Sequence, residues 1–372
     1  MTGPDTQFAI HPDVAQASTP PAWLYRPGPI QARIRERVLG GWQWLADEPD
    51  VPAPVGVLPT TLLPGSLAEP LLVTRSSEGL RCISNACTHR GHLVCSAPAR
   101  SPQLRCPYHG RRFRLDGAFQ SAPGFEGAAS FPAPEDDLAQ LPLAQWGPWL
   151  FTALGTPASG GADFESWIGP VRRRVGFLPL ERAVRLPERS RRWTVDGHFA
   201  LYVENYLEGL HIPFIHPGLV RTLDFGSYGH ELLPLGTLQI AEAAEGELAF
   251  EGPLPEGHPE TGRSIAAWYF WLFPNLMINV YPWGVSLNRV RPLGDNRAAI
   301  DFESYVFAPQ LLGRGAGGDL DAVEREDERA VESVQRGLRA SLWRRGRYAP
   351  EHEVGTHHFH RLLAQHLFPE SS

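Results

Sequence analysis

The chain has 372 residues, a formal net charge of −7 at pH 7 and 42% hydrophobic residues. This is the composition of a folded protein with two or three domains, and a mildly acidic chain of this kind is not expected to bind nucleic acid. The most apolar run, residues 266–285, is interrupted by Pro274 and Pro282 and predicts strands joined by a turn rather than a membrane span. No secretory signal is visible, so we expect a cytoplasmic protein whose thiols stay reduced.

The pattern of secondary structure changes along the chain. Residues 1–41 hold apolar side chains such as Ile30 and Ile34 at helical spacing, ending at Gly40-Gly41, and predict a helical arm. Residues 42–155 contain short β-rich runs divided by Gly and Pro, which predicts a small all-β domain. The Pro/Gly/Ser-rich segment 155–161 marks a boundary, and residues 156–372 alternate strand-like runs with helices, as is typical of an α+β domain.

All four cysteines fall between Cys82 and Cys106. Two belong to the motifs Cys87-Thr88-His89 and Cys106-Pro107-Tyr108-His109, on two loops of the predicted β domain. Zinc can be held by two thiolates and two imidazoles, and a Rieske [2Fe–2S] cluster uses the same set with the Cys on one iron and the His on the other. A Cys paired with a His in each loop is unusual for a zinc finger and favours the cluster. Cys82 and Cys95 are interpreted as small buried apolar residues.

These two motifs, followed by Gly91 and Gly110, resemble those of Rieske proteins. Respiratory members of high potential carry an extra Cys in each loop, where this chain has His92 and Tyr108. The resemblance therefore implies no disulfide at the cluster and a lower potential, which suits electron delivery to an oxygen-activating iron.

A second constellation lies in the run from Glu204 to Pro217. Asn205, Glu208 and His211 are spaced i, i+3, i+6, which predicts one helical face. Pro213 would end that helix and let His216 fold back toward His211. Two His and one carboxylate form the facial triad of non-haem Fe(II) enzymes that activate O₂, whereas two packing His residues are the plain alternative.

The missing carboxylate is sought in residues 319–345, which predict one long helix. Its apolar stripe runs through Val323, Ala330, Val331, Val334, Leu338 and Leu342. Asp327 lies on that stripe, where an acid is costly unless it is paired or bound to a metal. Asp327 is therefore the candidate ligand, with a buried Asp satisfied by Arg or a cap as the alternative. Three other acids lie off the stripe and are expected to be solvated: Glu324, Glu326 and Glu328.

This second region is similar to the catalytic domain of Rieske oxygenases, so that the resemblance extends over most of the chain. It implies that His211, His216 and Asp327 hold a mononuclear Fe(II), while Cys87, His89, Cys106 and His109 hold the [2Fe–2S] cluster. It also implies a catalytic antiparallel sheet flanked by helices, of the helix-grip (SRPBCC/START-like) type, with residues 1–41 packed on it. The expected activity is hydroxylation or oxidative demethylation of a small organic substrate with O₂, with electrons from a separate NAD(P)H-dependent reductase that carries flavin, ferredoxin or both.

Glu208 stands where many members of the family have Asp. The Glu variant is similar to the homotrimeric branch that acts on quaternary amines such as choline, carnitine and betaines. In the family this acid links a cluster His of one subunit to an iron-ligand His of the next, so we expect Glu208 to couple His109 or His89 to the neighbour's His211, with Asn205 as a further catalytic candidate. The alternatives are a satisfied carboxylate at this position and, for the substrate, an aromatic acid or secondary metabolite hydroxylated on its ring.

Three further motifs are weaker. Residues 313–318 match GxGxxG without a βαβ unit and predict a loop before a helix. The run 357–360, His-His-Phe-His, is expected to hold surface or packing residues. The aromatic runs 268–271 and 281–283 could line a pocket or cage a cation, although the core of a strand pair explains them as well. A pure electron carrier would need no second metal site, and a zinc protein would be colourless.

Overall fold

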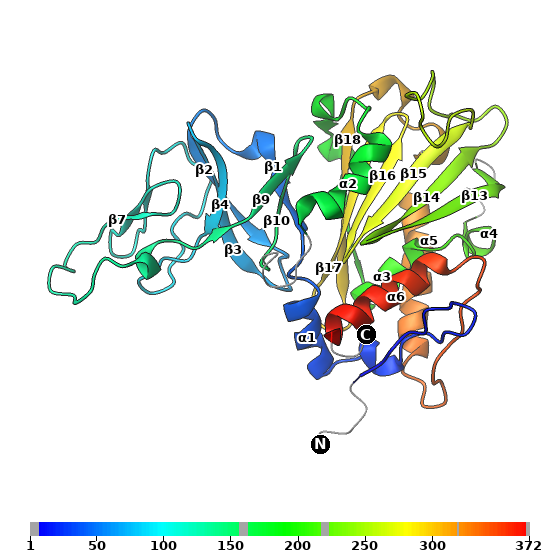
Figure 1. Cartoon of the computed structure of the whole chain (residues 1–372), viewed down its shortest axis with the longest axis horizontal. Helices are drawn as coiled ribbons and strands as arrows, with labels where there is room; N and C mark the ends of the chain where they lie inside the picture. The colour runs from blue at the N-terminus through cyan, green and yellow to red at the C-terminus, as the bar shows by residue number, and fades with distance from the viewer. Residues whose placement is uncertain (1–6, 156–162, 217–222, 318–319, 370–372) are drawn as a thin grey trace. The chain divides into compact units, whose positions relative to one another are not determined.

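The computed structural model describes residues 7–155, 163–216, 223–317 and 320–369 (Figure 1). The described chain divides into two compact units: Gly40–Ala162 form one, and Met1–Leu39 together with Asp163–Ser372 form the other. The predicted boundary segment falls largely on residues outside the described ranges. Within those ranges, no helix is long and apolar enough to cross a membrane.

The unit Gly40–Ala162 is all-β, as the sequence predicts. Its sheets have the orders β2-β3-β4-β8, β1-β10-β9 and β5-β6-β7, with antiparallel pairing throughout. The strands are β1 (Gln43–Asp47), β2 (Gly56–Leu62), β3 (Glu69–Ser76), β4 (Gly79–Ser84), β5 (Leu104–Arg105), β6 (Arg112–Phe113), β7 (Phe119–Ser121), β8 (Gln140–Leu141), β9 (Leu143–Trp146) and β10 (Trp149–Thr152). Cys87 and Cys106 belong to the same apolar core as Leu72, Ile83 and Phe113.

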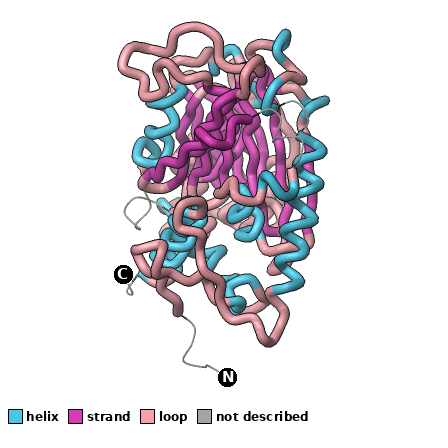
Figure 2. Tube along the Cα trace, turned by 90° about the vertical axis from the view of Figure 1, so that its right-hand side faces the viewer, coloured by secondary structure: helices cyan, strands magenta, loops and turns pink. Residues whose placement is uncertain are grey.

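The other unit is built on an antiparallel sheet in the order β11-β18-β17-β16-β15-β14-β13, with β12 also paired to β18. Its strands are β11 (Val184–Arg185), β12 (Arg191–Val195), β13 (Leu223–Leu233), β14 (Gly236–Ala243), β15 (Ile265–Leu272), β16 (Leu276–Tyr281), β17 (Gly284–Pro292) and β18 (Ala298–Val306). Its helices are α1 (Pro29–Arg37), α2 (Phe164–Val175), α3 (Phe199–Tyr206), α4 (Ile212–Ile215), α5 (Leu320–Gly337) and α6 (Val354–Leu367). Figure 2 shows these strands side by side in one layer with helices packed beside it. The α+β prediction is confirmed.

The two faces of this sheet differ in chemistry. Strand alternation and register place Gln239, Tyr269, Asn279, Ser286 and Ser304 in one line across β14 to β18, which we call the inner row. The inner row faces α3, because the hydroxyl group of Tyr206 lies 2.6 Å from Asn279 Oδ1. The opposite face carries apolar side chains such as Trp268, Ile278 and Val280 together with an ion-paired group of Arg289, Arg291 and Asp301. A buried polar row against a helix is unusual for a core, since buried polar groups need partners.

The N-terminal arm is joined to the rest of this unit by hydrogen bonds at the end of its first short helix, Ala22–Tyr25. Arg26 Nε donates to the carbonyl oxygen of Leu338 at 3.0 Å, and Gln335 Nε2 donates to the carbonyl oxygen of Tyr25 at 3.1 Å. The helix α1 is shorter than the predicted one, because Pro29 begins it in the first turn, where a missing N–H costs nothing, and regular helix ends at Arg37.

Helix α5 differs from the predicted helix over 319–345. It ends at Gly337, a residue with low helix propensity, and Leu342 beyond it is 91% exposed. Val334, expected on the buried stripe, is half exposed. The stripe prediction is therefore wrong for Val334, which lies within the helix, and for Leu342, which lies beyond its end, whereas Leu338 is buried as predicted.

The weaker motifs have structural roles. His357 and His360 are buried on α6, where their rings bond the carbonyl oxygen of His11 and the hydroxyl group of Tyr348. The aromatic runs lie on β15 and around the β16–β17 turn, with Trp268, Trp271 and Trp283 fully buried. The GxGxxG match follows β18 of an antiparallel sheet, and its last residue, Gly318, lies outside the described residues.

Candidate metal centres

The two Cys–His loops share one backbone pattern. The amide of Cys87 donates to the carbonyl oxygen of His92 at 2.9 Å, and the amide of Cys106 donates to that of Arg111 at 2.8 Å. In each loop the glycine four residues after the Cys donates back to the Cys carbonyl oxygen, at 2.8 Å for Gly91 and 3.0 Å for Gly110. Both glycines have positive φ, 71° and 76°, which side chains with a Cβ rarely adopt.

The side chains of these loops form a donor set with a buried and an exposed half. The thiols of Cys87 and Cys106 are buried in the core, whereas His89 and His109 lie at the surface with their Nδ1 atoms 3.1 Å apart. Two thiols on one side and two converging imidazole nitrogens on the other suit a cluster whose irons take different ligands. The residues present therefore fit a Rieske [2Fe–2S] cluster.

The remaining thiols stand apart from this set. All four cysteines, which lie within the described ranges, are free. Cys82 is buried in the core, and burial raises its thiol pKa to about 11. His92 and Tyr108, at the positions of the disulfide in respiratory proteins, instead place their rings 5.5 Å apart.

The second centre begins where α3 ends. The helix stops at Tyr206, Leu207 follows as its cap, and α4 begins after His211 with Pro213 in its first turn. The expectation of one continuous helical face from Asn205 to His211 is therefore wrong, because a turn separates them. Pro213 starts a helix here rather than ending one, as its fixed φ allows.

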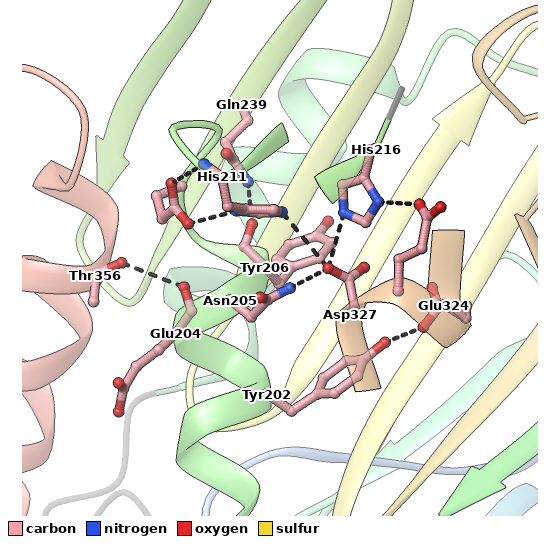
Figure 3. Close-up of polar contacts among 12 residues, drawn as sticks. Tyr202, Glu204, Asn205, Tyr206, His211, His216, Gln239, Glu324, Asp327 and Thr356 are labelled. Atoms are coloured by element: carbon pink, nitrogen blue, oxygen red, sulfur yellow. Dashed lines mark hydrogen bonds and ion pairs between the residues drawn. The ribbon is translucent and has the colours of Figure 1, made fainter. Parts of the chain in front are cut away.

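Long-range packing brings the three candidate iron ligands together (Figure 3). One ligand atom each from His211, His216 and Asp327 lies within 4.8 Å of the other two. His216 Nε2 lies 2.9 Å and His211 Nε2 lies 3.6 Å from Asp327 Oδ1. His216 and Asp327 are buried, and two imidazoles with one carboxylate suit Fe(II) with open coordination positions. The donor set fits a mononuclear iron.

On each of the two His rings, the nitrogen that does not face Asp327, Nδ1, lies against a carboxylate. Glu208 Oε1 lies 2.5 Å from His211 Nδ1, and Glu208 Oε2 accepts from the backbone amide of His211 at 3.1 Å. Glu326 Oε2 lies 2.7 Å from His216 Nδ1. Burial disfavours the charged form of His216, but the carboxylates of Asp327 and Glu326 outweigh it and raise the pKa of His216.

Glu326 is the residue that the sequence analysis missed. It was expected to be solvated, and its side chain is in fact only 32% exposed and bonded to His216. Glu324 also departs from that expectation, because it accepts a hydrogen bond from the hydroxyl group of Tyr202, and burial raises its pKa well above the usual range. Sequence periodicity carried no signal for Glu326, since its partner is 110 residues away.

Asn205 stands beside the ligand set. Its Nδ2 donates to Asp327 Oδ1 at 2.6 Å, so the amide holds the oxygen that both His rings face. The next residue, Tyr206, turns toward the sheet, where Gln239 Nε2 donates to its carbonyl oxygen at 2.7 Å. Figure 3 shows Tyr206 and Gln239 beside the three candidate ligands.

Comparison with known proteins identifies both domains of this chain. Residues 42–132 match the model of the Rieske [2Fe–2S] domain, and residues 200–368 match that of the ring hydroxylating alpha subunit catalytic domain. Choline monooxygenase of Spinacia oleracea is 28% identical, covering 94% of this chain and 79% of its own length. The carnitine monooxygenase oxygenase subunit of Escherichia coli K12 is also 28% identical, covering 79% of this chain and 80% of its own.

Solved structures agree in fold. A quaternary ammonium Rieske monooxygenase in complex with L-carnitine superposes with a TM-score of 0.73 at 21% identity, covering 96% of this chain and 97% of its own. Naphthalene 1,2-dioxygenase from a Rhodococcus species superposes with a TM-score of 0.71 at 20% identity, covering 95% of each chain. With both domain models matched in order and both donor sets assembled, the chain belongs to the Rieske non-haem iron oxygenases, as an alpha subunit that carries a [2Fe–2S] domain and a mononuclear iron domain.

Proposed function

We propose that this chain is the terminal oxygenase of a multicomponent system and that it oxidises a quaternary amine. Cys87, His89, Cys106 and His109 would hold the cluster, and His211, His216 and Asp327 would hold the iron. The observation that carries the iron assignment is the convergence of three ligand atoms, within 4.8 Å of one another, from segments more than 100 residues apart. When bound, the iron supplies O₂ activation with electrons that arrive singly from the cluster.

The protein's own part is to orient the ligands. Glu208 and Glu326 each accept from the Nδ1 of a His ring, which leaves Nε2 as the free lone pair directed at the metal position. Asn205 donates to Asp327 and fixes the carboxylate between the two rings. These side chains determine ring orientation and tautomer before any substrate arrives.

We further propose that electrons cross between subunits of a homotrimer through Glu208. The side chain of Glu208 is 14% exposed, so one side of it reaches the surface while the other holds His211. The neighbouring Leu210 and Phe214 are 39% and 80% exposed, which is apolar surface that a second copy would cover. A solved quaternary ammonium Rieske monooxygenase, alike in fold, is described in terms of inter-subunit electron transfer. In such a ring the cluster His of one protomer would lie against Glu208 of the next.

The choice of substrate class is supported by the side chains near the iron ligands. Tyr206, Tyr269 and Tyr281 gather between α3 and the inner face of the sheet, and burial raises the pKa of each phenol, so that all three stay neutral. Neutral aromatic rings attract an ammonium group through their faces. The choline and carnitine monooxygenases named above act on such cations.

The alternative substrate, an aromatic acid, would need a cationic partner, and among the described residues no Arg contacts His211, His216 or Asp327. The arginines of β17, the partly buried Arg289 and the buried Arg291, alternate to the opposite face of the sheet and bind Asp301 there. The iron ligands are instead flanked by the carboxylates of Glu208 and Glu326, each of which accepts from one of the two His rings. This surplus of acidic groups favours a positively charged substrate.

The test is turnover with a panel of substrates. Hydroxylation inserts one oxygen atom into a C–H bond and consumes O₂, two electrons and two protons, with water as the second product. When the carbon is bonded to nitrogen, the alcohol collapses to an aldehyde and a tertiary amine. We expect betaines, choline or carnitine to yield aldehyde and amine with a separate NAD(P)H-dependent reductase, while 3,3-dimethylbutanol, the uncharged isostere of choline, does not react. Turnover of aromatic acids without any amine release would overturn the proposed substrate class.

The remaining components follow from the same proposal. The reductase is a separate chain with flavin, ferredoxin or both, because the described part of this protein contains no dinucleotide-binding βαβ unit. We place the system in the cytoplasm, where the free cysteines would stay reduced.

A further inference from the structure

A buried guanidinium group lies behind the two cluster loops. Arg111 follows the second loop, two residues after His109, and is 2% exposed. Its backbone carbonyl oxygen accepts the amide of Cys106, so the residue is part of the loop that carries two of the candidate cluster ligands. Arginine is among the residues least often buried to this degree, and a buried charge needs compensation.

The head group of Arg111 connects the second loop to the first. Its Nη1 donates to Thr88 Oγ1 at 2.8 Å, and Thr88 is the residue between Cys87 and His89. The same hydroxyl group donates to the backbone carbonyl oxygen of Asp136 at 2.8 Å. The Nη2 of Arg111 donates to Asp136 Oδ1 at 2.7 Å, which gives the charge one carboxylate partner.

The rest of the guanidinium lies among aromatic rings. Its central carbon is 4.9 Å from the ring centroid of Phe119, 5.3 Å from that of Phe125 and 5.2 Å from that of Phe131. Its Nε has no hydrogen-bond partner among the described residues. Phe125 also packs edge-on against His89, with ring centroids 5.1 Å apart. The guanidinium charge of Arg111 is therefore shielded from water, and only the ring of Phe125 separates it from His89, a candidate cluster ligand.

We propose that Arg111 is a positioning residue that joins the two cluster loops and whose positive charge favours the reduced form of the [2Fe–2S] cluster. Reduction adds one negative charge to the cluster, and a cation held in a poorly screened site stabilises that added charge. Asp136 acts in the opposite direction, because its carboxylate partly cancels the charge of Arg111. The inference rests on the cluster and not on the substrate class, so either can fail without the other.

The test compares the reduction potential of the cluster in the wild-type protein and in variants, each loaded with the cluster. The potential is measured by redox titration, which is monitored by the visible spectrum and by the electron paramagnetic resonance signal of the reduced cluster. Arg111→Gln is expected to lower the equilibrium constant for one-electron reduction at least threefold, about 28 mV at 59 mV per tenfold. Arg112→Gln removes the same charge from the adjacent exposed residue of β6 and serves as the matched control, with a shift below that threshold.

Asp136→Asn keeps the side-chain shape and is expected to shift the potential upward. Equal potentials of Arg111→Gln and Arg112→Gln would overturn the proposal, as would shifts of Arg111→Gln and Asp136→Asn in the same direction. If Arg111→Gln does not retain the cluster, Asp136→Asn alone decides: an upward shift supports the electrostatic role, and an unchanged or lower potential refutes it.

Discussion

The carboxylate of Glu326 offers the sharpest test of how the iron site is organised. It accepts from His216 Nδ1 at 2.7 Å, and His216 in turn faces Asp327. Glu326→Gln keeps an acceptor oxygen in the same place and removes only the charge. The substitution therefore asks whether a charged partner behind the ring matters for metal binding at Nε2.

The expected magnitude follows from the contact. Hydrogen bonds to charged groups contribute about 1.5–3 kcal/mol net, and neutral ones are roughly half as strong. Because Glu326 is 32% exposed, its charge is partly screened by solvent, which favours the lower end of that range. We expect Glu326→Gln to weaken metal binding about three- to fivefold, or about 0.7–1 kcal/mol, which is less than the 10- to 100-fold losses typical when such a partner is removed altogether.

The assay is chelator competition for Fe(II) or Co(II) in protein whose cluster is intact, with the cluster spectrum as an internal check on folding. Glu332→Gln is the matched control, because it removes the same charge from α5 at a residue that contacts the backbone amide of Asp196 rather than a ligand. Equal metal affinity of Glu326→Gln and the wild-type protein, or an equal loss in Glu332→Gln, would refute the reasoning.

Three further outcomes are expected. Asp327→Ala should lose the mononuclear iron and turnover while keeping the visible spectrum of the cluster; loss of that spectrum, or surviving activity, would show the assignment to be wrong. Glu208→Gln should retain both metals but slow electron delivery in a single turnover, and an unchanged rate would exclude the proposed link between subunits. Burial lowers the pKa of His198 to about 3, so only the unfolded chain takes up its proton near pH 6.5. The free energy of unfolding should then fall by at most about 2.7 kcal/mol from pH 6.5 to 4.5, and His198→Asn should flatten this dependence in denaturant titrations.

The cluster loops and the secondary-structure pattern of this protein could be predicted from the sequence, because residues close together in the chain form them. Each candidate cluster loop is closed by hydrogen bonds between residues four and five positions apart, so Cys87-Thr88-His89 and Cys106-Pro107-Tyr108-His109 indicate the donor set by themselves. Strand and helix patterns likewise indicated an all-β domain followed by an α+β domain. Helix ends were less predictable: α5 stops at Gly337 although the apolar pattern continues, because propensity and packing, not periodicity, decide where a helix ends.

What the tertiary structure alone decided is how distant residues meet. Asp327 was selected from a pattern on its own helix, but its 2.9 Å approach to His216 depends on α5 packing against α3 and the turn that follows. Glu326 gained its partner in the same way, and no feature near it in the sequence distinguishes it from the solvated acids of that helix. The inner row is a product of strand register, which aligns Gln239, Tyr269 and Asn279 across neighbouring strands. A donor set within a short motif can be recognised from the sequence. A site built from distant segments forms only when burial of the apolar faces brings those segments together.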